Sequence, residues 1–121
     1  MIGLVLGETQ LGSLIIKRLK SLRKKFLIID ISKKKIYKKN INSFSLSMGQ
    51  LGKAISILRK HECKRIIFAG KVTTPNFSKA KFDFKALYYL PKIIKAAKKG
   101  DASTIKSVIS IFKKEGFKIL D

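Results

Sequence analysis

The sequence predicts a three-layer α/β domain with a mostly parallel sheet of about four strands, and two observations lead to this fold class. Four short apolar runs, at residues 2–6, 26–29, 65–69 and 117–120, are continuous rather than alternating, as in strands buried on both faces. The segments between these runs repeat apolar residues with the period of a helix. Strands that alternate with helices favour parallel pairing through right-handed crossovers.

The elements follow one another in a regular order along the chain. After the first strand a helix is predicted by one apolar face, and the same pattern recurs after residue 50 and after residue 104. These three faces consist of Leu11, Leu14, Ile15, Leu19 and Leu22, then Leu51, Ala54, Ile55 and Leu58, and finally Ile105, Val108, Ile109 and Phe112. Residues 32–40, which separate the second strand from the second helix, form a lysine-rich irregular connection.

The second half of the chain holds a long loop and an interrupted helical segment. The loop covers residues 71–81, directly after the third strand. We expect Pro91 to divide residues 84–97 into two short helices, because proline lacks the backbone N–H that a helix interior needs. The last helix is expected to begin at a cap formed by Asp101 or Ser103, and to end at Gly116.

Composition limits the classes of function. A chain of 121 residues fits one domain, and 45% hydrophobic residues exclude a disordered tail. The 28 lysines and arginines against seven acids give a net charge of +21, which indicates an anionic partner: nucleic acid, a membrane surface or a phosphorylated ligand. Only four of the basic residues are arginine. Biased codon usage accounts for lysine over arginine, but not for the scarcity of acids.

The single cysteine, Cys63, has no partner for an internal disulfide, and the sequence contains no Cys/His cluster with zinc-ligand spacing. No apolar run approaches the roughly 18 residues of a membrane-spanning helix. We therefore expect a cytoplasmic protein. His61 and Cys63 are interpreted as a cation at a helix end and a small buried thiol rather than as a reactive pair.

The topology places the ligand site before any motif is considered. In an open parallel sheet, ligands bind at the carboxyl edge of the strands. The loops 7–12 and 70–75 and the helix starts near residues 11, 49 and 101 all belong to that edge. The turn from Gly7 to Gly12 has neither the dinucleotide fingerprint nor the lysine of a phosphate-binding P-loop. It either presents backbone N–H groups to an anion or only permits a tight turn.

Three further motifs have two interpretations each. Asp30, at the end of the second strand, is either a ribose-binding acid or a cap for the following turn. The G-x-x-G-K element at 49–53 also occurs in KH RNA-binding domains, but there it joins two helices. The segment 69–78 presents Gly70, then Lys71, then two hydroxyls and Pro75; it suits a phosphate or sugar, and an ordinary long loop is the alternative.

Several short motifs, in the same order, resemble the N-terminal half of the I-type UDP-2,3-diacylglucosamine pyrophosphatase family of lipid A biosynthesis. They lie at 48–53, 66–72, 75–78, 90–91, 99–101 and 115–119. The chain departs from the family at Glu8 and Gly12, where the family's first loop reads G-G-G-x-L-P. It also departs at Thr74, which replaces an arginine, at Ala102, which replaces the last acid of G-D-D, and at Phe82-Asp83, where the family has Pro-Asp.

The resemblance implies hydrolysis of the UDP-diacylglucosamine pyrophosphate bond to UMP and 2,3-diacylglucosamine 1-phosphate, supported by a divalent cation, Mg²⁺. It also implies a second, C-terminal domain with the catalytic and metal-binding acids. We therefore expect residues 1–121 to be one Rossmann-like N-terminal domain of a longer protein, with its catalytic residues elsewhere; the alternative is a diverged stand-alone relative. Only Asp30, Asp83 and Asp101 offer carboxylates at the predicted edge. The candidate substrate-binding residues are Gly7, Gln10, Gly49, Gln50, Gly70, Lys71, Thr73, Pro75, Gly100 and Asp101.

The positive charge suggests that the protein also meets the anionic inner leaflet, through the loop 32–40 and the segment 79–99. Phe84, Leu87 and Tyr88 share one helical face and are expected in the core, which leaves Phe82 and Tyr89 to contact lipid. A basic nucleic-acid-binding module is the alternative function. The small number of arginines argues against it. An oxidoreductase is disfavoured by the missing dinucleotide fingerprint, and a homo-oligomer is left open.

Overall fold

The computed structural model describes residues 1–70 and 81–120, and this part of the chain forms an α/β domain around one sheet. The sheet has five strands in the order β3-β2-β1-β4-β5, and every pair is parallel. Their bounds are Ile2–Leu6 (β1), Phe26–Asp30 (β2), Ser43–Ser45 (β3), Arg65–Ala69 (β4) and Lys118–Leu120 (β5). This is the Rossmann order 3-2-1-4-5-6 without its sixth strand, so the predicted fold class is confirmed.

The central strand explains the continuous apolar runs. All five residues of β1 are buried, because β2 and β4 flank the strand and helices cover both faces of the sheet. Its register pairs Ile2 with Phe26 and with Arg65, and Leu6 with Asp30 and with Ala69. A strand in this position has no side that faces solvent, so apolar and polar residues do not alternate along it.

The short edge strand β3 was not expected from the sequence. It pairs with β2 over Ser43, Phe44 and Ser45, and the first two are half-buried while Ser45 is exposed. The ladder is held by backbone groups: the Ile28 N–H donates to the Asn42 carbonyl at 2.9 Å, and the Leu46 N–H donates to the Asp30 carbonyl at 2.9 Å. An edge strand with two serines has no apolar run, and only its pairing with β2 makes it a strand.

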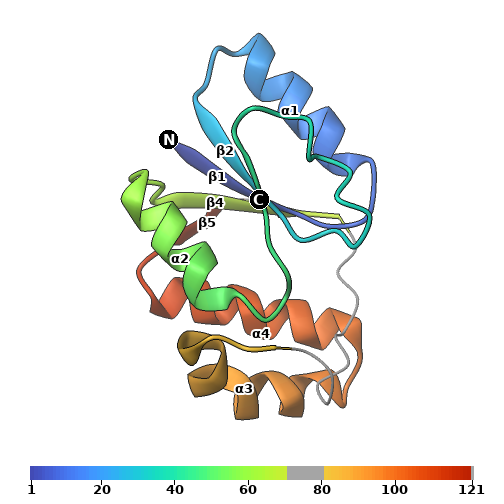
Figure 1. Cartoon of the computed structure of the whole chain (residues 1–121), viewed down its shortest axis with the longest axis vertical. Helices are drawn as coiled ribbons and strands as arrows, with labels where there is room; N and C mark the ends of the chain where they lie inside the picture. The colour runs from blue at the N-terminus through green and yellow to red at the C-terminus, as the bar shows by residue number, and fades with distance from the viewer. Residues whose placement is uncertain (71–80, 121) are drawn as a thin grey trace.

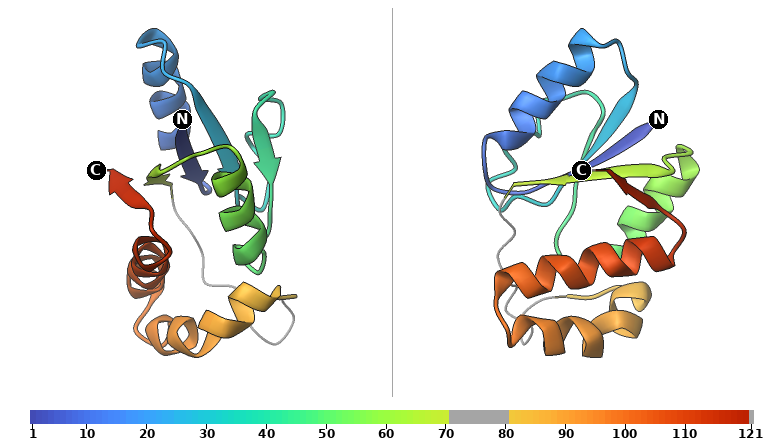
Figure 2. Two further views of the ribbon diagram at one scale, coloured as in Figure 1. Left: turned by 90° about the vertical axis from the view of Figure 1, so that its left-hand side faces the viewer. Right: turned by 180° about the vertical axis from the view of Figure 1, so that it is seen from behind.

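The helices form layers on the two faces of the sheet. Their bounds are Leu11–Ser21 (α1), Leu51–Lys60 (α2), Phe84–Ala97 (α3) and Asp101–Lys114 (α4). Figures 1 and 2 show α1 alone on one side of the sheet and α2 and α4 on the other, with α3 lying outside them at the far end of the molecule. On the α2 side the core includes Val5, Ile29, Ile55, Ile66 and Ile111; on the α1 side it includes Leu4, Leu6, Ile16, Leu19 and Ile28.

The predicted face of α2 is confirmed, but that of α1 is partly wrong. Leu51, Ala54, Ile55 and Leu58 are all buried, whereas the exposed fractions of Leu11, Leu14 and Leu22 are 50%, 65% and 49%. The buried residues of α1 are Gly12, Ile16 and Leu19. A Cβ on Gly12 would lie 2.9 Å from Leu6 Cδ1, so the missing side chain lets this edge of the helix approach the sheet. The close contact of Gly12 with the sheet therefore determines which apolar residues of α1 are buried.

Helix α3 departs from the sequence prediction in two ways. It continues through Pro91 as one helix; the proline is exposed, so water can solvate the Leu87 carbonyl that lacks its usual donor. The assignment of its faces is reversed as well: Phe84, Leu87 and Tyr88 are exposed, whereas Tyr89 is buried and Phe82 packs against the core. Because α3 has apolar residues on two faces, periodicity alone cannot tell which one is covered.

Both ends of α4 are determined by glycine. Gly100, with φ 111°, is the N-cap, so Asp101 is the first helical residue and neither Asp101 nor Ser103 is the cap. The predicted end at Gly116 is confirmed by its φ of 99° and by two capping bonds. The Gly116 N–H donates to the Lys113 carbonyl at 3.1 Å, and the Phe117 N–H donates to the Phe112 carbonyl at 3.0 Å. This is a Schellman motif, and the Phe112 and Phe117 rings accompany it with centroids 5.6 Å apart.

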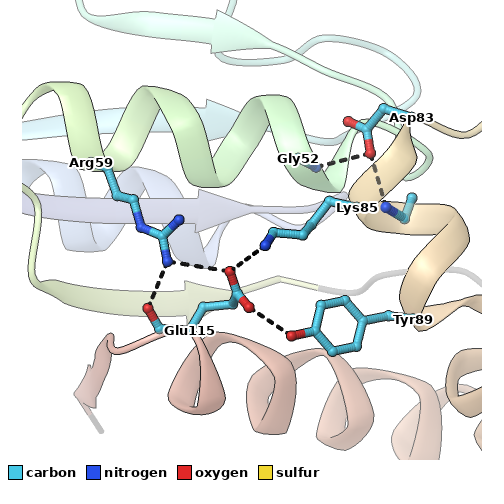
Figure 3. Close-up of polar contacts among 7 residues, drawn as sticks. Gly52, Arg59, Asp83, Lys85, Tyr89 and Glu115 are labelled. Carbon is cyan, nitrogen blue, oxygen red and sulfur yellow. Dashed lines mark hydrogen bonds and ion pairs between the residues drawn. The ribbon is translucent and has the colours of Figure 1, made fainter.

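A carboxylate at the end of α4 joins three helices (Figure 3). Glu115 Oε2 accepts a hydrogen bond from the Tyr89 hydroxyl of α3 at 2.6 Å, and Oε1 forms ion pairs with Lys85 Nζ at 3.0 Å and Arg59 Nη2 at 3.2 Å. Arg59 also donates to the Glu115 carbonyl at 2.9 Å. Since the Glu115 side chain is only 11% exposed, this network holds α3 against α2 and α4.

The Glu115 network makes stability depend on pH. The hydrogen bond from Tyr89 and the charges of Lys85 and Arg59 lower the pKa of Glu115 below its ordinary value of 4.5. The contribution is therefore complete above pH 4.5 and is lost as the pH falls through the lowered pKa. The same bond raises the pKa of Tyr89 to about 12, so the tyrosine contributes below pH 10 and loses its effect as the pH rises toward 12.

We expect Glu115→Gln to lower the free energy of unfolding at pH 7 by about 1–3 kcal/mol, because the buried tyrosine and two cations lose a charged acceptor. Denaturant unfolding between pH 3 and pH 7 tests this. The difference between the variant and the unmodified protein should shrink at the acid end. The exposed Glu62→Gln is the matched control, with an expected change within about 0.5 kcal/mol. A Glu115→Gln effect that stays constant down to pH 3 would contradict the assignment.

Candidate functional site

The topological switch point of the sheet lies between β1 and β4. From β1 the chain goes to β2 on one side, and from α2 it returns to β4 on the other, so the carboxyl ends of β1 and β4 are neighbours where the strand order reverses. Leu6 and Ala69 are register partners, and the Gly7 N–H donates to the Ala69 carbonyl at 2.9 Å. Open α/β sheets bind ligands at this position.

Gly7 and Gly70 meet backbone to backbone at the switch point. Gly70 has φ 88°, which strongly favours glycine, and a Cβ there would lie 3.0 Å from the Gly7 nitrogen and 3.1 Å from its carbonyl carbon. The prediction that the two loops open onto one edge is therefore confirmed for their first residues, Gly7 and Gly70. Lys71, Thr73 and Pro75 lie outside the described residues, and their role in substrate binding stays a prediction.

Gln10 stands at the start of α1, beside the switch point. It is the N-cap of α1, with φ and ψ of −77° and −4°, and its side-chain oxygen accepts from Ser13 Oγ at 3.4 Å rather than capping the helix. The first turn of α1 contains no acidic side chain. The positive end of the helix dipole is therefore not opposed there by a carboxylate of the same turn, which suits an anion.

The buried Tyr37 supports the loop before α1. Its hydroxyl donates to the Thr9 carbonyl at 2.9 Å, and a Cβ on Gly12 would come within 2.3 Å of the same hydroxyl oxygen. Burial raises the pKa of Tyr37 above its usual range, so the phenol stays a hydrogen-bond donor. Gly12 is therefore required for packing against Tyr37. This favours the interpretation that the glycine permits a tight turn over the interpretation that it exposes backbone N–H groups to an anion.

Asp30 supports the turn after β2. The side chain is completely buried: Oδ1 accepts from the Ser32 N–H at 3.0 Å and the Ser32 hydroxyl at 2.6 Å, and Oδ2 accepts from the Tyr37 N–H at 3.1 Å. Both oxygens are thus used within the protein. The structure therefore favours the turn-capping interpretation over the ribose-binding one.

The N-terminus of α2 is occupied by a side chain from another helix. Asp83 Oδ1 accepts from the Gly52 N–H at 3.0 Å and from the Ala86 N–H at 2.9 Å, and Oδ2 accepts from the Lys53 N–H at 3.0 Å (Figure 3). One carboxylate therefore caps α2 and α3 together. Because this carboxylate takes the place of an external anion, the glycines of the G-x-x-G-K element serve a contact within the fold.

Gly49 and Gln50 contribute to this contact and to a cavity. A Cβ on Gly49 would collide with the Lys81 carbonyl, and the Asp83 N–H donates to the Gly49 carbonyl at 3.0 Å. Gln50 Oε1 accepts from the Ser47 N–H at 2.8 Å. Behind Gln50, an apolar cavity of about 60 Å³ lies between the sheet and helices α2, α3 and α4, lined by Val5, Ile29, Phe68, Phe82, Val108 and neighbouring residues.

Gly100 and Asp101 lie at the exposed N-terminal end of α4. No atom of residues 1–70 and 81–120 lies within 4 Å of a Cβ built on Gly100, so within this part of the chain the glycine is required by backbone conformation and not by packing. Figure 1 shows this end of α4 on the same side of the molecule as the carboxyl end of β4. Their proposed place in a pocket wall stays a prediction.

The described residues give little support for a metal centre or a reactive thiol. Nowhere in residues 1–70 and 81–120 do three His, Cys, Asp or Glu side chains gather where they could hold a metal ion. The Cys63 side chain is 1% exposed, and burial raises the pKa of its thiol, which confirms the interpretation as a buried residue. At the predicted helix end, His61 is the C-cap of α2, and its Nδ1 lies 3.0 Å from the Ile57 carbonyl oxygen.

Sequence reasoning missed the double role of Asp83 and the support from Tyr37. The cap on α3 has a signal in the sequence, because an aspartate just before an apolar helical segment is a typical N-cap. The contact with α2 spans 31 positions, and the Tyr37–Thr9 bond spans 28, so neither has a local signal.

Comparison with known proteins adds the family to this geometry. In the described part of the chain, none of the helices is long and apolar enough to cross a membrane. The chain is 40% identical over 74 residues to the UDP-2,3-diacylglucosamine pyrophosphatase LpxI of Caulobacter vibrioides; the match covers 61% of this chain but only 26% of that relative. The family model described as the LpxI N-terminal domain matches residues 1–121. The chain therefore belongs to the LpxI N-terminal domain family.

Proposed function

We propose that this chain is the N-terminal, substrate-binding part of an enzyme that hydrolyses UDP-2,3-diacylglucosamine to UMP and 2,3-diacylglucosamine 1-phosphate. Membership of the family and the name of the Caulobacter relative support this activity. The observation that carries the binding role is the contact of Gly7 and Gly70 at the switch point, which is where open α/β sheets bind their ligands.

The chain's own residues would bind and orient the nucleotide end of the substrate. The start of α1 would direct backbone N–H groups and a positive dipole end toward a phosphate. Lys71 would add a positive charge, while Gly49, Gln50, Gly100 and Asp101 would form the wall of the pocket. We place the enzyme in the cytoplasm at the inner membrane, where a diacylated sugar nucleotide would be met.

The reaction itself is assigned to the rest of the protein. Mg²⁺ takes one or two carboxylates with free oxygens, and in residues 1–70 and 81–120 no three His, Cys, Asp or Glu side chains gather where they could hold a metal ion. Asp30 and Asp83 each accept three hydrogen bonds from the protein. We therefore derive no metal-dependent step from this chain, and no catalytic residue is proposed in it.

The proposal predicts that residues 1–121 bind UMP and UDP weakly and do not hydrolyse UDP-2,3-diacylglucosamine. Calorimetry with millimolar nucleotide, together with amide chemical shifts, tests the binding. The shifts should gather at Gly7, Gly70 and the start of α1. No heat and no shifts at millimolar UMP would contradict the binding role. Measurable turnover by the chain alone would contradict the assignment of the chemistry elsewhere.

Two glycine variants locate the nucleotide. Gly70→Ala and Gly116→Ala both place a side chain at positive φ, but only the Cβ at position 70 meets Gly7. We expect Gly70→Ala to weaken UMP binding roughly fivefold or more, equivalent to about 1 kcal/mol. Gly116→Ala, at the end of α4, should leave the affinity unchanged. Equal affinity of the two variants would show that UMP does not bind at the Gly7–Gly70 contact.

A further inference from the structure

Helix α3 presents an apolar stripe to solvent along its outer face. Phe84 is 91% exposed, Tyr88 72% and Leu87 49%, and Pro91 continues the stripe one turn further. The spacing of these residues places them on one side of the helix. Two large aromatic side chains in water are unfavourable unless something covers them, so a contiguous patch of this kind indicates an interaction surface.

The stripe is held in place by the buried side of the same helix. The Tyr88 ring packs edge-on against Tyr89, with centroids 4.9 Å apart and an interplanar angle of 89°. Tyr89 is in turn fixed by its hydrogen bond to Glu115. Figure 2 shows α3 at the end of the molecule farthest from α1, so a flat surface can reach the stripe without meeting the sheet.

The surroundings of the stripe are strongly basic. Exposed lysines precede, flank and follow it at positions 81, 92, 95, 98 and 99, and Lys85 lies in the same first turn. Residues 81–99 contain six lysines against one acid, Asp83, and that acid caps two helix N-termini. The net charge around α3 is therefore positive, which is complementary to an anionic surface.

Aromatic and aliphatic residues flanked by lysines are typical of helices that lie in the plane of a membrane interface. At 14 residues, α3 is too short to span a bilayer, and its tyrosine suits the headgroup level. We propose that the outer face of α3 is an in-plane docking surface for an anionic lipid bilayer, with Phe84 and Leu87 entering the acyl boundary and the lysines meeting lipid phosphates. This inference does not depend on the proposed enzymatic function.

The absence of tryptophan from the chain allows a direct test. Phe84→Trp places one fluorophore on the stripe, and Ile41→Trp places one at another fully exposed apolar position, before β3. With vesicles of phosphatidylglycerol and phosphatidylcholine, we expect the emission of the Phe84→Trp variant to shift to shorter wavelength and to be quenched by lipids brominated on the acyl chain. The emission of the Ile41→Trp variant should not change. Before vesicles are added, emission of the Phe84→Trp variant at the wavelength of exposed tryptophan should show that position 84 is still in water.

A second pair of variants separates the apolar contact from general attraction by a charge of +21. Phe84→Ser with Tyr88→Ser should weaken partitioning into anionic vesicles roughly tenfold or more, because two large side chains no longer leave water. Leu14→Ser with Ile41→Ser removes two other exposed apolar side chains and should change partitioning less than about twofold. Binding should rise with the phosphatidylglycerol fraction and fall with added salt.

Several outcomes would overturn the proposal. Equal loss in the two serine pairs, or no loss in either, would mean that charge alone holds the protein to the vesicles. A concentration-dependent blue shift of the Phe84→Trp variant without vesicles would identify a second copy of the chain as the occupant. Shielding of the fluorophore at position 84 by RNA and not by lipid would assign the surface to nucleic acid.

Discussion

Replacing Asp30 by alanine should lower the free energy of unfolding by about 3–4 kcal/mol, because three buried donors lose a charged acceptor at once. For a domain of this size, that corresponds to a fall in melting temperature of roughly 10–15 °C. The donors are the Ser32 N–H, the Ser32 hydroxyl and the Tyr37 N–H. Thermal unfolding followed by circular dichroism measures the change.

The Asp30 variants also separate a structural role from a ribose-binding one. Tyr37→Phe removes only the bond to the Thr9 carbonyl and should cost about 1 kcal/mol, while loosening the loop before α1. Asp30→Asn keeps the shape of the side chain but turns an amide N–H₂ toward one of the donors. If Asp30→Asn abolished nucleotide binding and left the melting temperature unchanged, the turn-capping role would be wrong and the ribose-binding role right.

Replacing Asp83 by alanine should lower the free energy of unfolding by about 2–3 kcal/mol, because one substitution uncaps two helices. The carboxylate accepts from the N–H groups of Gly52 and Lys53 in α2 and from that of Ala86 in α3. It also places a negative charge at the positive ends of both helix dipoles. Chemical denaturation gives the free energy, and hydrogen exchange at Gly52 and Ala86 shows whether both termini open.

Control substitutions sharpen the Asp83 prediction. Asp83→Asn retains one acceptor oxygen and no charge, so its effect should fall between those of the alanine variant and the unmodified protein. Glu62→Gln removes one negative charge from an exposed site and should change stability by less than about 0.5 kcal/mol. If hydrogen exchange in Asp83→Ala rose at Ala86 but not at Gly52, the cap on α2 would contribute nothing.

The strands that could be predicted from the sequence are those with continuous apolar runs. β1, β2 and β4 contain buried residues, and burial leaves a mark on composition, whereas β5 is exposed or half-buried along its length. β3 could not be predicted in this way, because Ser43 and Ser45 become a strand only through hydrogen bonds to β2. The continuous course of α3 through Pro91 could not be predicted from the sequence either. It depends on the proline facing water, and the side of α3 that faces water is determined by the tertiary structure.

The sequence predicted at which edge of the sheet the candidate site lies, but not which hydrogen bonds its residues form. Topology correctly brought the Gly7 and Gly70 loops together, since strand order determines which loops are neighbours. Which side chains could bind a ligand at that edge was harder to predict. The carboxylates of Asp30 and Asp83 were candidates from the sequence, but both accept hydrogen bonds from backbone N–H groups of the protein. The reversed faces of α3 have a similar cause: a helix with two apolar faces needs the position of its neighbours before either face can be assigned.

The apolar cavity between the sheet and helices α2, α3 and α4 has a mechanical consequence. The part of this cavity that holds no water disappears when the protein unfolds, so it adds to the decrease in system volume on unfolding. Hydrostatic pressure therefore acts against the native state at this cavity, and the helices over it can shift toward the sheet under compression. The α2, α3 and α4 layer is thus a compressible part of the domain, and the wall containing Gln50 is part of it.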